Sequence, residues 1–132
     1  MKNAFDYNSN PATFSRASVV ETTSITKTMY VSGTASIGTN GETLHKNDFR
    51  KQLIQTFNNI TSVLVEDGFT WKNVVRTTIY LKDIDENYEE FNKIRAEWFD
   101  EVGITNYPAS TCIQARMCRP DLLCEIEAIA VK

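Results

Sequence analysis

The residues best suited to acid–base chemistry in this chain lie near its carboxyl end. In an extended strand from Leu123 to Val131, alternate side chains point to opposite faces. One face carries Glu125 and Glu127 among apolar residues, and the other face is apolar apart from a cysteine. Such a strand must aim its carboxylates at water, at a partner chain or at a binding site. A glutamate held at a site can donate or accept a proton during a reaction.

The cysteines and the histidine limit the other chemistry that the chain can carry. Cys112, Cys118 and Cys124 are evenly spaced, unlike the close pairs of structural zinc sites, and His45 is the only histidine. We therefore expect three free thiols and neither a metal nor a cofactor. A single histidine in a polar segment also argues against Ser-His or Cys-His nucleophilic catalysis. Carboxylates, thiols, tyrosine or lysine remain as acid–base groups.

Length and charge exclude several classes of partner. A chain of 132 residues is long enough for one domain with a single core. Its net charge of −3 gives no basic footprint for nucleic acid. We find neither a signal-peptide pattern nor an apolar run near the roughly 20 residues that cross a bilayer. The expectation is a single cytoplasmic domain, 1–132, that binds neither nucleic acid nor a membrane.

Hydrophobic periodicity predicts the elements that position these residues. Residues 1–13 are expected to be loosely held. The pattern predicts two helices, Asp48–Asp67 and Asp85–Val102. It also predicts strands around Ser18–Glu21, over Thr28–Ile37 and Val74–Leu81, and two more near the carboxyl end, joined by a short turn at Arg119–Asp121. Gly33, inside a predicted strand, indicates a bulge or a close backbone approach by a ligand.

The predicted order ββαβαββ favours an α+β fold, in which two helices cover one face of a mixed sheet. The opposite face then has no helical layer, although it carries both apolar and charged side chains. Such a face is usually closed by self-association, so the pattern predicts a homo-oligomer.

Four segments resemble the Rid (YjgF-type) reactive-intermediate deaminase superfamily over nearly the whole chain. They are Tyr30–Gly33, Gln55–Ile60, Val74–Asp83 and Cys124–Val131. The resemblance implies a homotrimer of chorismate-mutase-like fold, with three clefts between subunits. It also implies hydrolysis of enamine or imine intermediates, such as 2-aminoacrylate, to 2-oxo acids and ammonia.

The resemblance also implies which residues form the site. Cleft positions that match are Cys112, Glu125, Ser32, Gly33 and Asn92. Ser110, however, stands where the deaminases carry an arginine that clamps the substrate carboxylate. A serine supplies one neutral donor where a guanidinium supplies a charged fork.

Three other arginines are candidates for the missing charge: Arg16, Arg116 and Arg119. Arg16 belongs to the segment Phe14–Ala17, which stands where the deaminases carry a glycine-proline-tyrosine stretch. As alternatives, Arg16 and Arg119 are surface charges, and Arg116 pairs with a carboxylate such as Glu127.

Three segments, Phe14–Ala17, Ser32–Ile37 and Cys118–Glu125, are similar to the carboxyl-terminal half of chorismatases, which remove pyruvate from chorismate. That similarity implies Cys118 as a site residue and Glu125 as a proton donor. The leading hypothesis is a homotrimer that binds a small carboxylate in clefts between subunits and hydrolyses or tautomerises an enamine, imine or enol-type group. In it Glu125 is the acid–base group, and Cys112 and Cys118 line the pocket. The alternatives are a non-catalytic metabolite-binding trimer and chorismatase-like hydrolysis of an enol ether.

Overall fold

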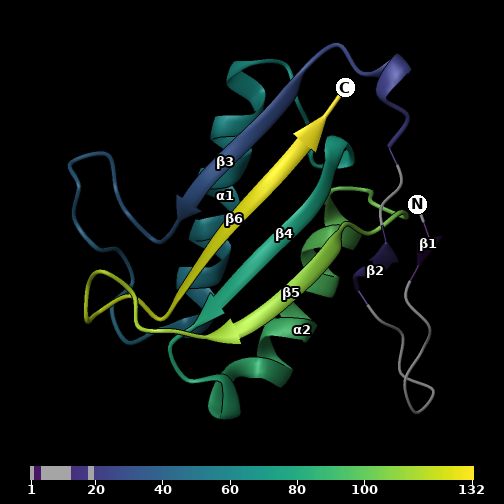
Figure 1. The fold of residues 1–132 in the computed structure, drawn as a ribbon. Coiled ribbons are helices and arrows are strands. Elements are labelled where there is room, and N and C mark those ends of the chain that lie inside the picture. Colours follow the sequence, from purple (N-terminus) through teal and green to yellow (C-terminus); the bar gives the residue numbers. More distant parts are fainter. Residues whose placement is uncertain (1, 4–12, 18–19) are drawn as a thin grey trace.

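The computed structural model describes residues 2–3, 13–17 and 20–132, which form a mixed sheet with two helices. The strands are hydrogen-bonded in the order β1-β2-β5-β4-β6-β3 (Figure 1). Their bounds are β1 Lys2–Asn3, β2 Ser15–Ala17, β3 Thr28–Thr34, β4 Val74–Leu81, β5 Ala109–Gln114 and β6 Cys124–Val131. The pairs β2–β5 and β4–β5 are parallel, whereas β6 is antiparallel to both β4 and β3.

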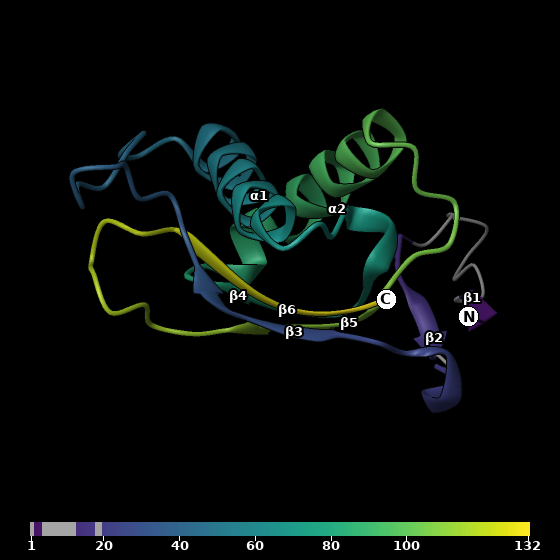
Figure 2. The ribbon, with the colours of Figure 1, turned by 90° about the horizontal axis from the view of Figure 1, so that it is seen from above.

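Both helices lie on one face of the sheet, and Figure 2 shows the opposite face open. The helix α1 (Phe49–Glu66) begins after Asp48, whose side chain accepts a hydrogen bond from the backbone N–H of Lys51. Asp83 caps the second helix, α2 (Ile84–Glu101), in the same way. The first helix ends at Glu66, and Gly68, two residues later, has a φ of +75° that suits the left-handed position after a helix. Neither helix in the described part of the chain is long and apolar enough to cross a bilayer.

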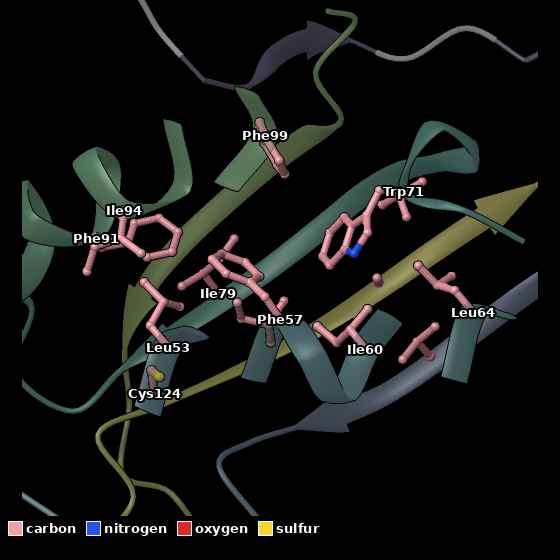
Figure 3. Close-up of a cluster of buried hydrophobic side chains, with 14 of the residues drawn as sticks. Leu53, Phe57, Ile60, Leu64, Trp71, Ile79, Phe91, Ile94, Phe99 and Cys124 are labelled. Carbon is pink, nitrogen blue, oxygen red and sulfur yellow. The ribbon is translucent and has the colours of Figure 1, made fainter. Parts of the chain in front are cut away.

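The core fills the space between the helices and the sheet (Figure 3). Phe57 of α1 lies at its centre, stacked on Trp98 with a centroid distance of 5.3 Å and edge-on to Trp71 at 5.7 Å. Completely buried side chains each stabilise the fold by about 1.5–3 kcal/mol. They include Leu53, Ile60 and Leu64 of α1, Phe91 and Ile94 of α2, and Ile79 and Leu81 of β4.

The predicted α+β fold, with two helices on one face of a mixed sheet, is confirmed. The strand Val74–Leu81 has the predicted bounds, and both helices differ from prediction by only a residue at an end. The strand expected around Ser18–Glu21 is wrong in its described part. The strand β2 already ends at Ala17, and residues 20 and 21 lie outside any strand, while 18 and 19 fall outside the described residues. Most of residues 1–13, expected to be loosely held, also fall outside them.

The sequence pattern predicted a short turn between the last two strands, and this prediction is wrong. Strand β4 lies between β5 and β6, and residues 115–123 connect the two strands around its end (Figure 1). The physical reason is that β5 pairs with β4 in parallel after the crossover through α2, which leaves the other edge of β4 for β6.

Candidate functional site

Glu125 lies on the open face of the sheet, directly over Gly33 of β3. A Cβ atom placed on Gly33 would be 2.5 Å from Oε1 and 3.0 Å from Cδ of Glu125. The pairing of β3 with β6 shifts register between Val31 and Thr34, which agrees with the first of the two interpretations of Gly33, a bulge. The glycine therefore leaves room for the carboxylate to lie against bare backbone. Ser32 is exposed next to it, and its carbonyl accepts a hydrogen bond from the Thr34 hydroxyl.

Hydrogen bonds occupy two other polar side chains of this face, Tyr80 and Arg76. The Tyr80 hydroxyl donates to Glu127 Oε1 over 2.9 Å, and this bond, together with burial and the charge of Glu127, raises the pKa of Tyr80. Arg76 donates to the Thr111 hydroxyl over 2.8 Å. Among the described residues, Glu127 thus has the tyrosine, rather than Arg116, as its partner. Glu125 has no ion pair among them.

Two side-chain amides of α1, those of Gln52 and Asn59, hold the backbone segments just before β6 and just after β3. Gln52 is completely buried, donates to the carbonyl of Asp121 over 2.9 Å, and accepts from the N–H of Leu123 over 2.8 Å. Asn59 donates to the carbonyls of Ala35 and Ile37, just beyond β3. These bonds fix the entry to β6 and the exit from β3, and so the place where Glu125 meets Gly33.

Three other predicted residues gather on the opposite face of the sheet, under α2. Ser110 and Cys112 of β5 pair with Thr77 and Ile79, whose side chains face the helices, and Asn92 lies on α2. Burial raises the pKa of the Cys112 thiol. A surface hollow of about 490 Å³ lies beside Cys112, and its other lining residues are Ile84, Asp85, Glu86, Tyr88 and Glu89.

A fourth arginine, Arg95 of α2, joins this group although the sequence analysis did not select it. Its guanidinium donates to Ser110 Oγ over 3.0 Å, to Asn92 Oδ1 over 2.9 Å and to Thr13 Oγ1 over 2.8 Å. Its side chain is only 4% exposed, and burial lowers its pKa to about 10. We call Ser110, Cys112, Asn92 and Arg95 the Ser110 half-site.

Six of the predicted site residues therefore lie in two groups on opposite faces of one sheet. Glu125, Ser32 and Gly33 lie on the open face, and the Ser110 half-site lies on the helical face. Because the sheet separates them, a single protomer does not bring them together.

The connection from residue 115 to 123 carries two of the predicted arginines and Cys118. Met117 and Leu122 are buried with Ala35 in a small cluster that packs against Tyr80, which holds the connection near the Glu125 end of the open face. Arg116 and Cys118 are exposed on it.

The arginines differ in how far the structure commits them. Arg119 donates to the carbonyl of Gly41 over 2.7 Å, which ties two loops together. With Arg116 and Lys82 it lines a cationic pocket of about 530 Å³, whose other lining residues are Gln114, Ala115, Met117 and Pro120. Arg16 follows Ser15, which pairs with Ala109, so its backbone lies at the Ser110 end of β5, while its side chain falls outside the described ones.

Comparison with known proteins identifies the fold. The crystal structure of a protein of unknown function of the conserved Rid protein family from Yersinia pestis aligns over 100% of this chain and 96% of its own. The TM-score is 0.82 and the identity 26%. The architecture is therefore that of a Rid-fold domain.

Sequence relatives agree with the structural likeness. A RutC family protein of Aquifex aeolicus is 34% identical over 79% of this chain and 80% of its own length. A 3-aminoacrylate deaminase RutC of Acinetobacter baylyi is 31% identical over 86% of each chain. The family described as Endoribonuclease L-PSP matches residues 9–132. The chain belongs to this family and, through it, to the Rid superfamily, as its motifs indicated.

Proposed function

We propose that this protein hydrolyses or tautomerises a small carboxylate that carries an enamine, imine or enol-type group, with Glu125 as the acid–base group. One observation carries the proposal: the Glu125 carboxylate lies over the bare backbone of Gly33, on the open face, without an ion-pair partner among the described residues. A carboxylate that is positioned but not neutralised remains available for proton transfer. The deaminase name of the Acinetobacter relative supports the reaction class.

The complete site, in this proposal, forms between protomers of a cytoplasmic homotrimer. Two features support it. The open face exposes large apolar side chains, including Tyr30 at 77% and Ile113 at 45%, which association would cover. The two groups of site residues also lie on opposite faces of the sheet, so a cleft that uses both needs a second copy. Mass measurement by light scattering is expected to give three chains per particle, and a monomer would contradict this assembly.

Cations around the cleft would hold the carboxylate of the ligand. Arg116 and Arg119 line the cationic pocket beside the open face, and Arg16 belongs to the strand next to β5. Cys112 would line the cleft from the helical face, and Cys118 from the connection. The endoribonuclease activity in the family's name is not part of the proposal, because the net charge is −3 and the one histidine, His45, is exposed on a loop.

The test is turnover of enzymatically generated 2-aminoacrylate and 2-iminobutyrate, followed by release of pyruvate or 2-oxobutyrate. Glu125→Gln should lower the rate roughly 10²- to 10⁴-fold, the usual contribution of a positioned acid–base group. Glu127→Gln is the matched control, because it lies on the same face of β6 and already has Tyr80 as a partner. If the Glu125 variant were as active as the control, Glu125 would have no part in proton transfer.

The second candidate is a trimer that binds metabolites without turnover. Ser110 favours it, because this hydroxyl is neutral and already accepts a bond from Arg95. Ser110→Arg separates the two candidates when the wild type is inactive: deamination gained by that variant would show that only the clamp is missing. Release of pyruvate from chorismate, measured alongside, would indicate enol-ether hydrolysis instead.

A further inference from the structure

The guanidinium of Arg95 is a buried positive charge with no negative partner among the described residues. Its three hydrogen bonds to described residues go to the neutral side-chain oxygens of Thr13, Ser110 and Asn92. The two ion pairs of the described chain, Lys46–Asp121 and Arg50–Glu97, lie elsewhere. A buried charge is normally paired, because its removal from water is otherwise strongly unfavourable.

The aromatic rings around Arg95 lower the free-energy cost of burying its charge but do not remove it. The guanidinium carbon lies 4.6 Å from the ring centroid of Phe91 and 5.8 Å from that of Phe14, distances at which aromatic rings attract a cation. A ring, however, contributes no net charge. The lowered pKa, about 10, records the uncompensated burial and still leaves the group charged at neutral pH.

The guanidinium also keeps hydrogen-bonding capacity. An arginine has five N–H donors in a rigid fork, and the bonds to Thr13, Ser110 and Asn92 use three of them. Two remain, and a planar fork matches the two oxygens of a carboxylate. The half-buried Cys112 and the partly exposed Tyr88 both act electrostatically on Arg95, and both line the 490 Å³ hollow. That hollow therefore opens beside two of the residues whose charges act on Arg95.

We propose that Arg95 is the cation that binds the carboxylate of the ligand in the Ser110 half-site, with Ser110 and Asn92 orienting its fork. Asp85, Glu86 and Glu89 at the rim of the hollow do not cancel this charge. Rim charges are screened by salt, whereas a buried charge is screened much less. The inference rests on the proposed function in one respect, that the protein binds small carboxylates.

Binding of 2-oxobutyrate, compared with its neutral amide 2-oxobutyramide, tests the inference by calorimetry. The wild type should prefer the carboxylate, and Arg95→Met should lose roughly 10- to 100-fold of affinity for it while binding the amide unchanged. Arg95→Lys, which keeps the charge but not the fork, should fall between them. Arg50→Met is the matched control, because this arginine is exposed on α1 and pairs with Glu97.

A second measurement needs no variant, in case Arg95→Met does not fold. The Nε–H resonance of Arg95 in the nitrogen-15 spectrum of the wild type should shift with 2-oxobutyrate and not with the amide. An absent shift would overturn the inference. So would a folded Arg95→Met variant with undiminished preference, or a wild type that binds no carboxylate.

The outcomes also separate this inference from the proposed function. Arg95-dependent binding without turnover would support the inference and contradict catalysis. Turnover that does not depend on Arg95 would do the reverse. If Arg95→Met changes the particle mass instead of ligand affinity, the anion is a carboxylate of another protomer, and the inference is wrong.

Discussion

Replacing Gly33 by alanine should disable the site while leaving the fold intact. The new Cβ would lie 2.5 Å from Glu125 Oε1, whereas ordinary contacts begin at 3.4 Å, so the carboxylate must move by about 0.9 Å. It can move, because it is the end of a flexible side chain. A displacement near 1 Å costs on the order of 10²-fold in rate when position controls the reaction. That factor corresponds to about 2.7 kcal/mol of transition-state stabilisation.

The stability of the same variant should change little. Gly33 is not in the left-handed region of φ, so alanine fits its backbone, and removing a glycine stabilises by about 0.4–1 kcal/mol through the unfolded chain. Pushing the carboxylate aside offsets part of this gain. We expect the free energy of unfolding, measured with urea, to stay within about 1 kcal/mol of the wild type.

Gly38→Ala supplies the matched control. A Cβ at Gly38 would also meet the flexible end of a glutamate, that of Glu42, in a loop outside the proposed site. Turnover of 2-aminoacrylate should fall in the Gly33 variant and not in the Gly38 variant. Equal turnover in both folded variants would refute the idea that Gly33 exists to place the Glu125 carboxylate.

Three further predictions concern the elements around the site. Gln52→Ala should lower the free energy of urea unfolding by about 2–4 kcal/mol, because it leaves a buried carbonyl and N–H without partners, and exposed Asn58→Ala should not. Glu127→Gln should return the pKa of Tyr80 toward 10 in a near-ultraviolet titration. The stabilisation from the raised pKa is present below pH 10 and is lost as the pH rises through the folded-state pKa, and an unchanged titration would contradict this assignment. A thiol reagent near pH 7 should modify exposed Cys118 first and Cys124, whose pKa burial raises to about 12, only on unfolding; rapid labelling of Cys124 in the folded protein would contradict its burial.

The helices and the central strand were predictable because local pattern and tertiary packing agree there. The apolar stripe Phe49–Leu64 has a single period, an aspartate before it and a glycine after it. The strand Val74–Leu81 alternates cleanly. Tertiary packing therefore stabilises the same helices and the same strand that the local sequence favours.

The neighbours of a strand are less predictable than the strand itself. β5 and β6 follow one another in sequence, which favours a hairpin, yet β4 lies between them. Parallel pairing after a helical crossover leaves no local signal in the sequence. For the same reason the sequence did not predict that Glu125 lies over Gly33. The glycine indicated a bulge, but the side chain that lies over it depends on the register of a distant strand.

Arg95 was missed for a different reason. On α2 the helical period points both Ile94 and Arg95 inward, and the isoleucine accounts for the apolar stripe without help. An arginine on an inner helical position is therefore the signal that could have found it. Two of its three partners, Thr13 and Ser110, come from outside α2, and no helical pattern connects them with Arg95.

The connection from residue 115 to 123 contains both buried residues that hold it in place and exposed residues that the fold does not constrain. Met117 and Leu122 anchor it to the body of the protein, while Arg116 and Cys118 project from it with no strand register to obey. Glu125, by contrast, is fixed by a sheet and by a glycine opposite. If Glu125 transfers protons as proposed, exchange of a few exposed residues on this segment would change which ligand enters while that carboxylate stays in place.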